Sequence, residues 1–371
     1  MGCRNYTQDK ADVCHYKEYI DPNESPVTSA IMFAAGIFGN VAALVILEIR
    51  RRRYSRCENV RRSALFHIFI LSLVITDLTG TCLISPLVQL SYARNRTLIG
   101  LVSCAPSLCQ YFGASMNFFS LATMSLLFIT AVERCLAIGY PYLYSRHVTR
   151  KCAYVAIPLL FLFCLVFCLL PFASFGKYVQ YCPGTWCFID MNPEGLEDRV
   201  YANLYATVML VLVLAIVVCN GFVVLQLFRM YRRRKRQGSV VAAKRSNSDR
   251  RKMSMAEEVE HLILLVFMTI IFIICTLPLV IRVYINSIIR SESHAQDLEA
   301  LRFISLNSIV DPWVFILLSP SVLHFFWFSI CRAPLGTSRG SVCKTLAMET
   351  STVNVRLSHT SYKEQFPCAN V

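Results

Sequence analysis

The chain has 371 residues, of which 55% are hydrophobic and only 16% are charged, and its formal net charge is +14. Soluble domains average about 25% charged residues, so the composition excludes an ordinary soluble protein and indicates an integral membrane protein. The sequence contains no nucleophile–base or metal-ligand constellation, so we expect neither an enzyme nor a bound cofactor or metal.

Seven segments are long and apolar enough to cross a bilayer, which takes about 20 residues of helix. Helices in the core of soluble proteins rarely reach this length without a charged face. The sequence therefore predicts an all-α fold, a bundle of seven transmembrane helices followed by a short amphipathic eighth helix. The expected spans are 27–49, 64–90, 106–138, 153–175, 201–228, 260–288 and 298–319.

The remaining segments are arranged around the seven-helix domain, 27–319. Residues 1–26 are polar and have no apolar core of a signal peptide, so we expect an extracellular segment and an uncleaved first span. Within the basic loop 229–259, the Ser-rich stretch 232–252 is expected to be disordered, and Ser254 is either a kinase site or, with Glu257, a capping box that opens the sixth span. Residues 320–331 are expected to form the amphipathic helix, and 332–371 a disordered cytoplasmic tail.

The loops after the odd-numbered spans carry most of the basic residues, for example in 50–62 and 229–237. The positive-inside rule then places the N-terminus outside the cell and the C-terminus in the cytoplasm, in the plasma membrane. Nucleic-acid binding would also explain arginine runs, but these runs adjoin apolar spans, so we do not expect it. The sequons at Asn5 and Asn95 both fall on the predicted outer side, where glycosylation occurs.

Six of the 17 cysteines fall on or near the outer side, where disulfides are expected. Six cysteines allow 15 complete pairings, and the sequence alone does not choose among them. Cys331 lies beside an aromatic stretch just past the seventh span, and it is either a palmitoylation site or a free thiol.

Polar side chains interrupt the apolar spans at Asn40, Asp77, Asn307 and Asp311. A carboxylate in hydrocarbon needs partners, so these residues are expected to form one cluster. Such a cluster either binds a cation, relays protons or switches the bundle, or it only holds the helices together.

The seventh span also contains Arg302, nine residues before Asp311. On a regular helix nine residues make about 2.5 turns, so the two charges lie on opposite faces and do not pair. Arg302 either extends to the outer headgroups or serves as counter-ion for an anionic ligand, with Ser305 one turn deeper. Arg282 has the same two interpretations.

The sequence resembles the rhodopsin-like G-protein-coupled receptors along the whole seven-helix core. The resemblance is carried by Asn40, Asp77 and Cys109, by the triplet Glu133-Arg134-Cys135, and by Pro278 and Asp311-Pro312. Cys135 stands where tyrosine is usual, the sixth span lacks the usual tryptophan, and Asp311 replaces asparagine.

These departures are similar to the prostanoid receptor branch. The segments "YVQYCPGTWCF" (178–188) and "LRFISLNSIVDPW" (301–313) resemble its second outer loop and its seventh helix. Within the branch, "TDLTGTCLISP" (76–86), "SYARN" (91–95) and "SMAEE" (254–258) are most similar to the second E-type group. That group binds prostaglandin E2 and couples to the stimulatory G protein.

The resemblance implies roles for particular side chains. Arg302 would bind the ligand carboxylate, assisted by Tyr92 and Thr185, while Thr81 and Ser305 would face its oxygens and Met116 its apolar tail. Arg282 matches no ligand-binding residue of the family, so its side chain is expected to extend to the lipid headgroups. The implied disulfides are Cys109–Cys187 and Cys14–Cys182, with Cys3 and Cys104 unassigned. The switch towards the G protein would be formed by Glu133, Arg134, Asp77, Asn307 and Asp311. Receptor kinases and arrestin would be further partners.

Two related alternatives share these motifs, the prostaglandin D2 and prostacyclin receptors. A channel or transporter is a remote alternative, because the chain shows no internal repeat.

Overall fold

The computed structural model describes residues 13–20, 24–54, 63–102, 107–237, 245–289 and 294–318. Several predictions therefore concern residues outside the described part: the sequon at Asn5, Cys3 and Cys104, Cys331, the eighth helix at 320–331 and the tail at 332–371.

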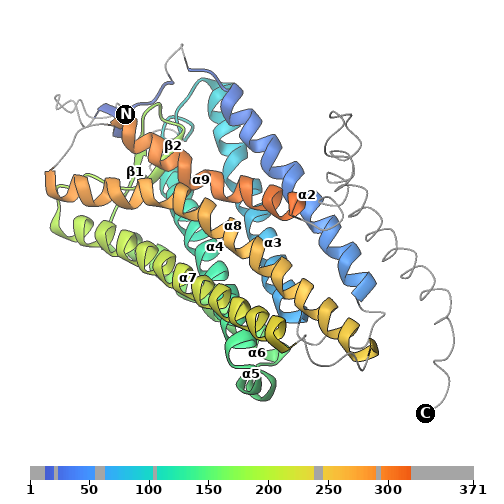
Figure 1. Ribbon diagram of the computed structural model, residues 1–371. Helices are drawn as coiled ribbons and strands as arrows, with labels where there is room; N and C mark the ends of the chain where they lie inside the picture. Colours follow the sequence, from blue (N-terminus) through green and yellow to red (C-terminus); the bar gives the residue numbers. More distant parts are fainter. Residues whose placement is uncertain are drawn as a thin grey trace, which may run out of the picture. The chain divides into compact units, whose positions relative to one another are not determined.

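The described residues form nine α-helices, one short 3₁₀ helix and one β-hairpin (Figure 1). In chain order they are α1 (Val13–Tyr16), α2 (Val27–Tyr54), α3 (Ser63–Arg94), α4 (Ser107–Gly139), α5 (Pro141–His147), α6 (Arg150–Leu169), η1 (Leu170–Ala173), β1 (Tyr178–Tyr181), β2 (Trp186–Ile189), α7 (Leu196–Gln237), α8 (Arg245–Ile289) and α9 (His294–Leu317).

Seven of these helices are long and apolar enough to cross a membrane, and they coincide with the seven expected spans. Their spans are Val27–Ile49, Leu65–Arg94, Ser107–Gly139, Arg150–Ala173, Leu196–Arg233, His261–Ile289 and Ala295–Leu317. The predicted seven-helix bundle is confirmed.

Helix α4 passes through the middle of the bundle, behind α7 and α8 in Figure 1. Within its most apolar stretch 67% of the residues are buried, against 17% in α6. It packs on α3, α6 and α7 and on both strands. A helix that is apolar on all sides can be enclosed in this way, whereas α6 presents most of its surface to lipid. Residues on α4 can therefore line internal cavities on several sides.

Helices α2 and α9 pack closely along one seam. A Cβ added to Gly39 would lie 2.8 Å from Nε1 of Trp313, so the absence of a side chain permits this approach. The Trp313 Nε1–H donates to the Ala35 carbonyl at 3.2 Å, and the Asn40 amide donates to the Ser308 carbonyl at 3.0 Å. This seam fixes which face of α9 points into the bundle.

Strands β1 and β2 pair antiparallel, with Tyr178 opposite Ile189 and Tyr181 opposite Trp186. Two disulfides fasten this hairpin, Cys109–Cys187 to α4 and Cys14–Cys182 to α1. Both pairings implied by the family resemblance are present. We call this part of the bundle, with the hairpin and residues 13–20, the hairpin end.

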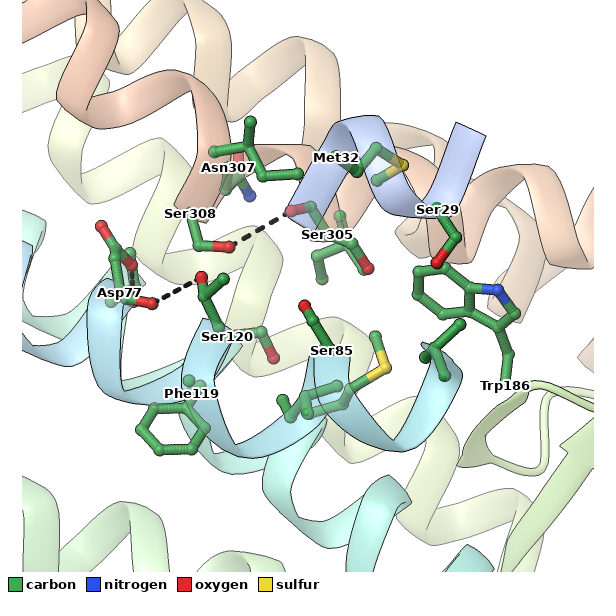
Figure 2. A pocket seen from close by; sticks show the side chains of 18 of the residues that line it. Ser29, Met32, Asp77, Ser85, Phe119, Ser120, Trp186, Ser305, Asn307 and Ser308 are labelled. Carbon is green, nitrogen blue, oxygen red and sulfur yellow. Dashed lines mark hydrogen bonds between the residues drawn. The ribbon is translucent and has the colours of Figure 1, made fainter. Parts of the chain in front are cut away.

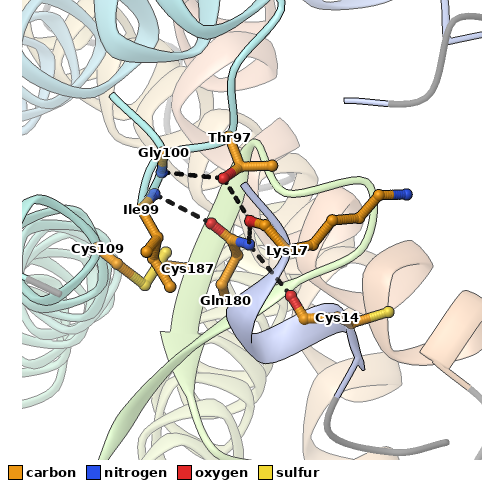
Figure 3. The surroundings of a disulfide bond; sticks show 8 residues. All are labelled: Cys14, Lys17, Thr97, Ile99, Gly100, Cys109, Gln180 and Cys187. Atoms are coloured by element: carbon orange, nitrogen blue, oxygen red, sulfur yellow. Dashed lines mark hydrogen bonds between the residues drawn. A yellow bond between two sulfur atoms is a disulfide. The ribbon is translucent and has the colours of Figure 1, made fainter. Parts of the chain in front are cut away.

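Gln180 lies at the centre of the hairpin end (Figure 3). Its amide donates to the carbonyls of Cys14 and Lys17 at 3.1 and 2.9 Å, and its Oε1 accepts the Ile99 N–H at 3.2 Å. Thr97 adds a bond from its hydroxyl to the Lys17 carbonyl. One buried side chain thus joins three segments far apart in the sequence.

The basic loop between the fifth and sixth spans is more helical than expected. Helix α7 continues to Gln237 and α8 begins at Arg245, so the prediction that 232–252 is disordered is wrong for 232–237 and 245–252. The predicted capping box is also wrong, because Ser254 lies inside α8. Arg, Lys, Met, Ala and Glu dominate this stretch, and they favour helix continuation.

Candidate functional site

An internal cavity of about 90 Å³ lies between α2, α3, α4 and α9, with β2 and α8 each contributing one side chain (Figure 2). Its wall is mostly apolar with hydroxyl groups distributed over it. Sites for small molecules have the same mixture of apolar wall and few polar groups but measure about 300–1,000 Å³, so a ligand bound here also extends beyond this cavity.

Five of the residues predicted to act line this cavity together. Thr81 and Asp77 come from α3, Met116 from α4, and Ser305 and Asn307 from α9. The Thr81 hydroxyl donates to the Asp77 carbonyl at 2.8 Å, and the Ser305 hydroxyl donates to the Leu301 carbonyl at 2.9 Å. Both hydroxyl oxygens keep acceptor capacity for a ligand donor.

Several lining residues were missed by the sequence reasoning. Trp186 from β2 and Phe272 from α8 reach the cavity from elements whose approach the sequence does not specify. Ser85 could have been found, because it stands four residues after Thr81 and so shares its helix face. The other missed residues with hydroxyl groups are Ser29, Ser120, Thr123 and Ser308.

The three residues proposed for the carboxylate do not line the cavity. Arg302 is exposed and, within the described part of the chain, its side chain has no hydrogen bond or ion pair. Tyr92 is half-buried, and Thr185 is fully buried with its hydroxyl oxygen unpaired among the described residues.

Arg302 nevertheless adjoins the cavity-lining face of α9. Ser305 and Ile309 line the cavity, and they stand three and seven residues after Arg302. At about 100° per residue, seven residues return to within about 20° of the same direction. Arg302 therefore leaves α9 in nearly the same direction as Ile309, about two turns nearer the beginning of the helix.

Asp311 lies in different surroundings from Arg302. It is 1% exposed, and neither carboxylate oxygen has a hydrogen-bond partner among the described residues. One carboxylate oxygen of Asp77 accepts a hydrogen bond from the Thr123 hydroxyl at 3.0 Å, and the other has no hydrogen-bond partner among the described residues. Arg302 and Asp311 are therefore not partners, as the helix geometry predicted, and Asp311 belongs to a buried polar region with Asp77 and Asn307.

Arg282 does not extend to headgroups, so that prediction is wrong. Its Nε donates to the Asp297 carboxylate at 2.8 Å and its Nη1 to Gln296 at 2.7 Å, and Asn286 donates to the same carboxylate at 3.1 Å. Burying an ion pair costs desolvation free energy, and the attraction repays this cost only when the remaining groups are also hydrogen-bonded. The Asn286 amide supplies these additional bonds to Asp297. This network ties α8 to α9 at the hairpin end.

A second ionic cluster lies at the opposite end of the bundle, which we call the Arg134 end. The Arg134 guanidinium donates to both oxygens of Glu133, at 2.5 and 2.7 Å, and the Tyr144 hydroxyl donates to Glu133 at 2.5 Å. The guanidinium carbon also lies 4.9 Å from the centroid of the Phe66 ring, which stacks on His261 of α8. Side chains of α3, α4, α5 and α8 therefore meet here.

The hairpin carries its own buried carboxyl group, Asp190, just after β2. Burial raises the pKa of this carboxyl to about 6, although the Asn192 N–H donates to it at 3.0 Å and favours the charged form. Burial also raises the pKa of Tyr181 well above its usual value, with Asp190 and Asp297 adding to the shift. The Tyr181 hydroxyl donates to the Ile189 carbonyl at 2.7 Å and stays neutral.

The fold and the cavity define a class of protein. The family description "7 transmembrane receptor (rhodopsin family)" matches residues 39–315, and the chain belongs to this family. The solved structure of squid rhodopsin superimposes with a TM-score of 0.66 over 91% of this chain and 87% of that chain, at 13% identity, which supports the fold alone.

Within the family the chain belongs to the prostanoid receptors, and it is a multi-pass protein of the plasma membrane. It is 46% identical over 330 residues to the human prostaglandin E2 receptor EP2 subtype, covering 87% of this chain and 90% of that receptor. The rat EP2 subtype is 44% identical, covering 91% and 95%. The human prostacyclin receptor is 42% identical, covering 89% and 82%. The predicted non-enzymatic role agrees with this family.

Proposed function

We propose that the protein is a prostaglandin E2 receptor that couples to the stimulatory G protein and raises cyclic AMP. The observation that carries the proposal is the convergence of Thr81, Met116 and Ser305 from three helices on one cavity. The ligand class follows from the prostanoid family, and the E2 type from the higher identity to EP2 subtypes than to prostacyclin receptors.

The cavity has the chemistry that the body of a prostaglandin needs. Such a ligand is a long apolar acid with a few ring and chain oxygens, so it requires apolar walls and a small number of placed polar groups. Thr81 and Ser305 offer hydroxyls to the ring oxygens, and Met116 with its apolar neighbours contacts the tail.

Arg302 is the proposed partner of the carboxylate. It adjoins the Ser305 face of α9 and has no ionic partner among the described residues, so a ligand acid does not have to displace one. Its planar fork binds a carboxylate through two hydrogen bonds. Tyr92 and Thr185 assist, the latter after its unpaired hydroxyl turns towards the ligand.

The proposed orientation has the hairpin end outside the cell and the Arg134 end in the cytoplasm. The sequon at Asn95 then lies outside, and Asn95 itself is exposed. Ligand binding shifts a two-state bundle, and the Glu133–Arg134 pair with the Asp77, Asn307 and Asp311 region responds to the change. Receptor kinases and arrestin would act on the cytoplasmic side.

The proposal is tested by cyclic AMP measurement in transfected cells over prostaglandins E2 and D2 and a prostacyclin analogue. We expect prostaglandin E2 to be the most potent. A preference for prostaglandin D2 or the prostacyclin analogue, or no cyclic AMP response to any of them, would contradict it.

The proposed contact between Arg302 and the ligand carboxylate is tested with the variant Arg302→Ala. Loss of one member of a hydrogen-bonded charge pair costs about 2–5 kcal/mol, so we expect prostaglandin E2 potency to fall by about 30-fold or more. The matched control is Arg94→Ala, an exposed arginine of α3 near the same end. Prostaglandin E2 methyl ester lacks the charge, so it should be weak on the wild-type receptor and no weaker on Arg302→Ala. If Arg302→Ala reduced the potency of the ester as much as that of the acid, the ionic role would be contradicted.

A further inference from the structure

Two free cysteines meet where α4 packs on α7, at the Arg134 end of the bundle. Cys135 directly follows Arg134 on α4, and its thiol donates to the Cys219 carbonyl of α7 at 3.0 Å. The same thiol also hydrogen-bonds the Cys219 thiol. Two helices from separate parts of the chain therefore bring one thiol each into mutual contact.

The helices approach closely around this pair. One turn after Cys135, a Cβ added to Gly139 would lie 2.5 Å from Cε1 of Phe222, so the absence of a side chain permits the approach. The Tyr140 ring stacks on the same phenyl ring, with centroids 6.3 Å apart and planes 11° apart. A disulfide requires Cα atoms about 4.4–6.8 Å apart, a separation that two helices reach where small side chains face each other.

Both thiols are half-buried and lie near the end of the bundle. Cys135 stands four residues before the last residue of α4, Gly139, which is about 6 Å along the helix axis. A small uncharged oxidant dissolved in water reaches this depth. Cys164 and Cys168 are also neighbours, but they are buried on the single helix α6, so a bond between them would fasten no second helix.

The residues beside the two cysteines join further helices. Arg134, next to Cys135, pairs with Glu133 and lies against the Phe66 ring of α3. Asn220, next to Cys219, donates to the Thr269 hydroxyl of α8 at 2.6 Å. A covalent bond between the cysteines would therefore restrict α4 and α7 at the level where both contact the other helices of the Arg134 end.

We propose that Cys135 and Cys219 are a redox site, which a hydroperoxide converts from two thiols into a disulfide that fixes α7 to α4. The Arg134 end lies in the cytoplasm in the proposed orientation, where thiols are kept reduced and disulfides are transient and redox-sensing. The resting receptor therefore carries the dithiol. The consequence for signalling rests on the proposed function: the oxidised receptor binds its ligand but activates the G protein less.

The reaction with hydrogen peroxide has two steps. One thiol sulfur attacks a peroxide oxygen and the O–O bond breaks, which gives a sulfenic acid and one water. The neighbouring sulfur then attacks the sulfenic sulfur, and the oxygen leaves as a second water with the remaining thiol proton. The two thiols lose two electrons in total, and the peroxide gains them. The adjacent second thiol removes the sulfenic acid before it is oxidised further.

The bond is detected by peptide mapping of the full-length receptor in lipid nanodiscs, treated with hydrogen peroxide and then with N-ethylmaleimide to block the remaining thiols. Trypsin releases residues 135–146 and 200–229, and each of these peptides contains a single cysteine. A mass equal to the two joined peptides therefore identifies the Cys135–Cys219 bond. Cys219→Ser is the test variant, and Cys152→Ser, which removes an exposed free thiol of α6, is the matched control.

We expect the joined peptides to increase severalfold with peroxide in the wild type and in Cys152→Ser, and to be absent from Cys219→Ser. The bond should also raise the unfolding temperature of the wild type by several degrees relative to Cys219→Ser treated in the same way. No joined peptide in the oxidised wild type, or a bond from either peptide to a different cysteine, would overturn the site. Thermal unfolding without peroxide establishes that each variant is folded.

The effect on signalling has a separate readout, nucleotide exchange on the purified stimulatory G protein after catalase has removed the peroxide. Oxidation should lower the maximal response to prostaglandin E2 severalfold in the wild type and in Cys152→Ser, and should leave Cys219→Ser unchanged. Equal exchange before and after oxidation, in a receptor that carries the joined peptides, would overturn the regulatory effect. No response of the unoxidised wild type would instead contradict the proposed function, while the peptide result would stand.

Discussion

The hairpin end and the Arg134 end each contain an ion pair, but the two described disulfides both lie at the hairpin end. At the hairpin end two disulfides and the buried Gln180 join the hairpin to α1, α4 and the segment around Ile99. At the Arg134 end the described contacts are an ion pair, hydrogen bonds and stacked rings. Covalent bonds do not open on the timescale of signalling, whereas ionic and ring contacts exchange readily. The difference indicates a fixed frame at one end and a movable one at the other.

The largest expected effect comes from removing the Cys109–Cys187 bond. Loss of a native disulfide typically costs about 2–5 kcal/mol, so Cys109→Ser with Cys187→Ser should lower the unfolding temperature and abolish most surface expression. Differential scanning fluorimetry and surface labelling measure the two effects. Cys82→Ser is the control, because Cys82 is an exposed free cysteine. If the double variant were as stable as this control, the hairpin end would not be the fixed frame.

The next effect is a pH dependence of stability at the hairpin end. The folded-state pKa of Asp190, about 6, lies above the usual 3.8, so the folded state retains a proton that the unfolded state loses. Stability from this group is therefore fully present below about pH 4 and is lost as pH rises to about 6, by about 3 kcal/mol. Lys177, Asp198 and Asp297 are the other charges that act on it.

Asp190→Asn should remove this dependence and make the receptor more stable than wild type near neutral pH, because the amide oxygen still accepts the Asn192 N–H. Intrinsic tryptophan fluorescence during heating, recorded over this pH range, gives the difference between variant and wild type. Glu194→Gln, an exposed carboxylate in the same loop, should show no such difference. A constant offset between Asp190→Asn and wild type at all pH values would contradict the prediction.

The smallest effect concerns the Arg134 end. Tyr144→Phe removes a hydrogen bond to the charged Glu133, worth about 1.5–3 kcal/mol, while the two Arg134 bonds remain. We expect ligand-free cyclic AMP to rise by about tenfold or more and the unfolding temperature to fall by a few degrees. Tyr142→Phe in the same helix is the control, since Tyr142 is 72% exposed. A basal signal that does not rise in Tyr144→Phe would remove the evidence for a movable end.

Local regularities of the sequence were sufficient for the seven spans and for the faces of α9. The separation of Arg302 from Asp311 followed from the helical repeat alone, and so did the common face of Asn307 and Asp311. Hydropathy is an average over neighbouring residues, and the helical repeat is a fixed local geometry, so both apply without knowledge of the fold.

Contacts between side chains of different helices could not be predicted from hydropathy and the helical repeat. Arg282 was assigned to the headgroups because its carboxylate, Asp297, lies beyond a turn and becomes a partner only when α8 and α9 pack. Trp186 and Phe272 reach the cavity for the same reason, since hairpin docking and helix rotation decide which side chains point inward.

The sequence by itself determined that this chain crosses the membrane seven times and, through its motifs, which family it belongs to. Only the tertiary structure showed that Thr81, Met116 and Ser305 share one cavity with Trp186 and Phe272, and that Phe119 lines both this cavity and a second one between α3, α4 and α6. The physical reason is that bilayer insertion depends on the composition of each segment, whereas a site depends on the rotation and packing of several segments together.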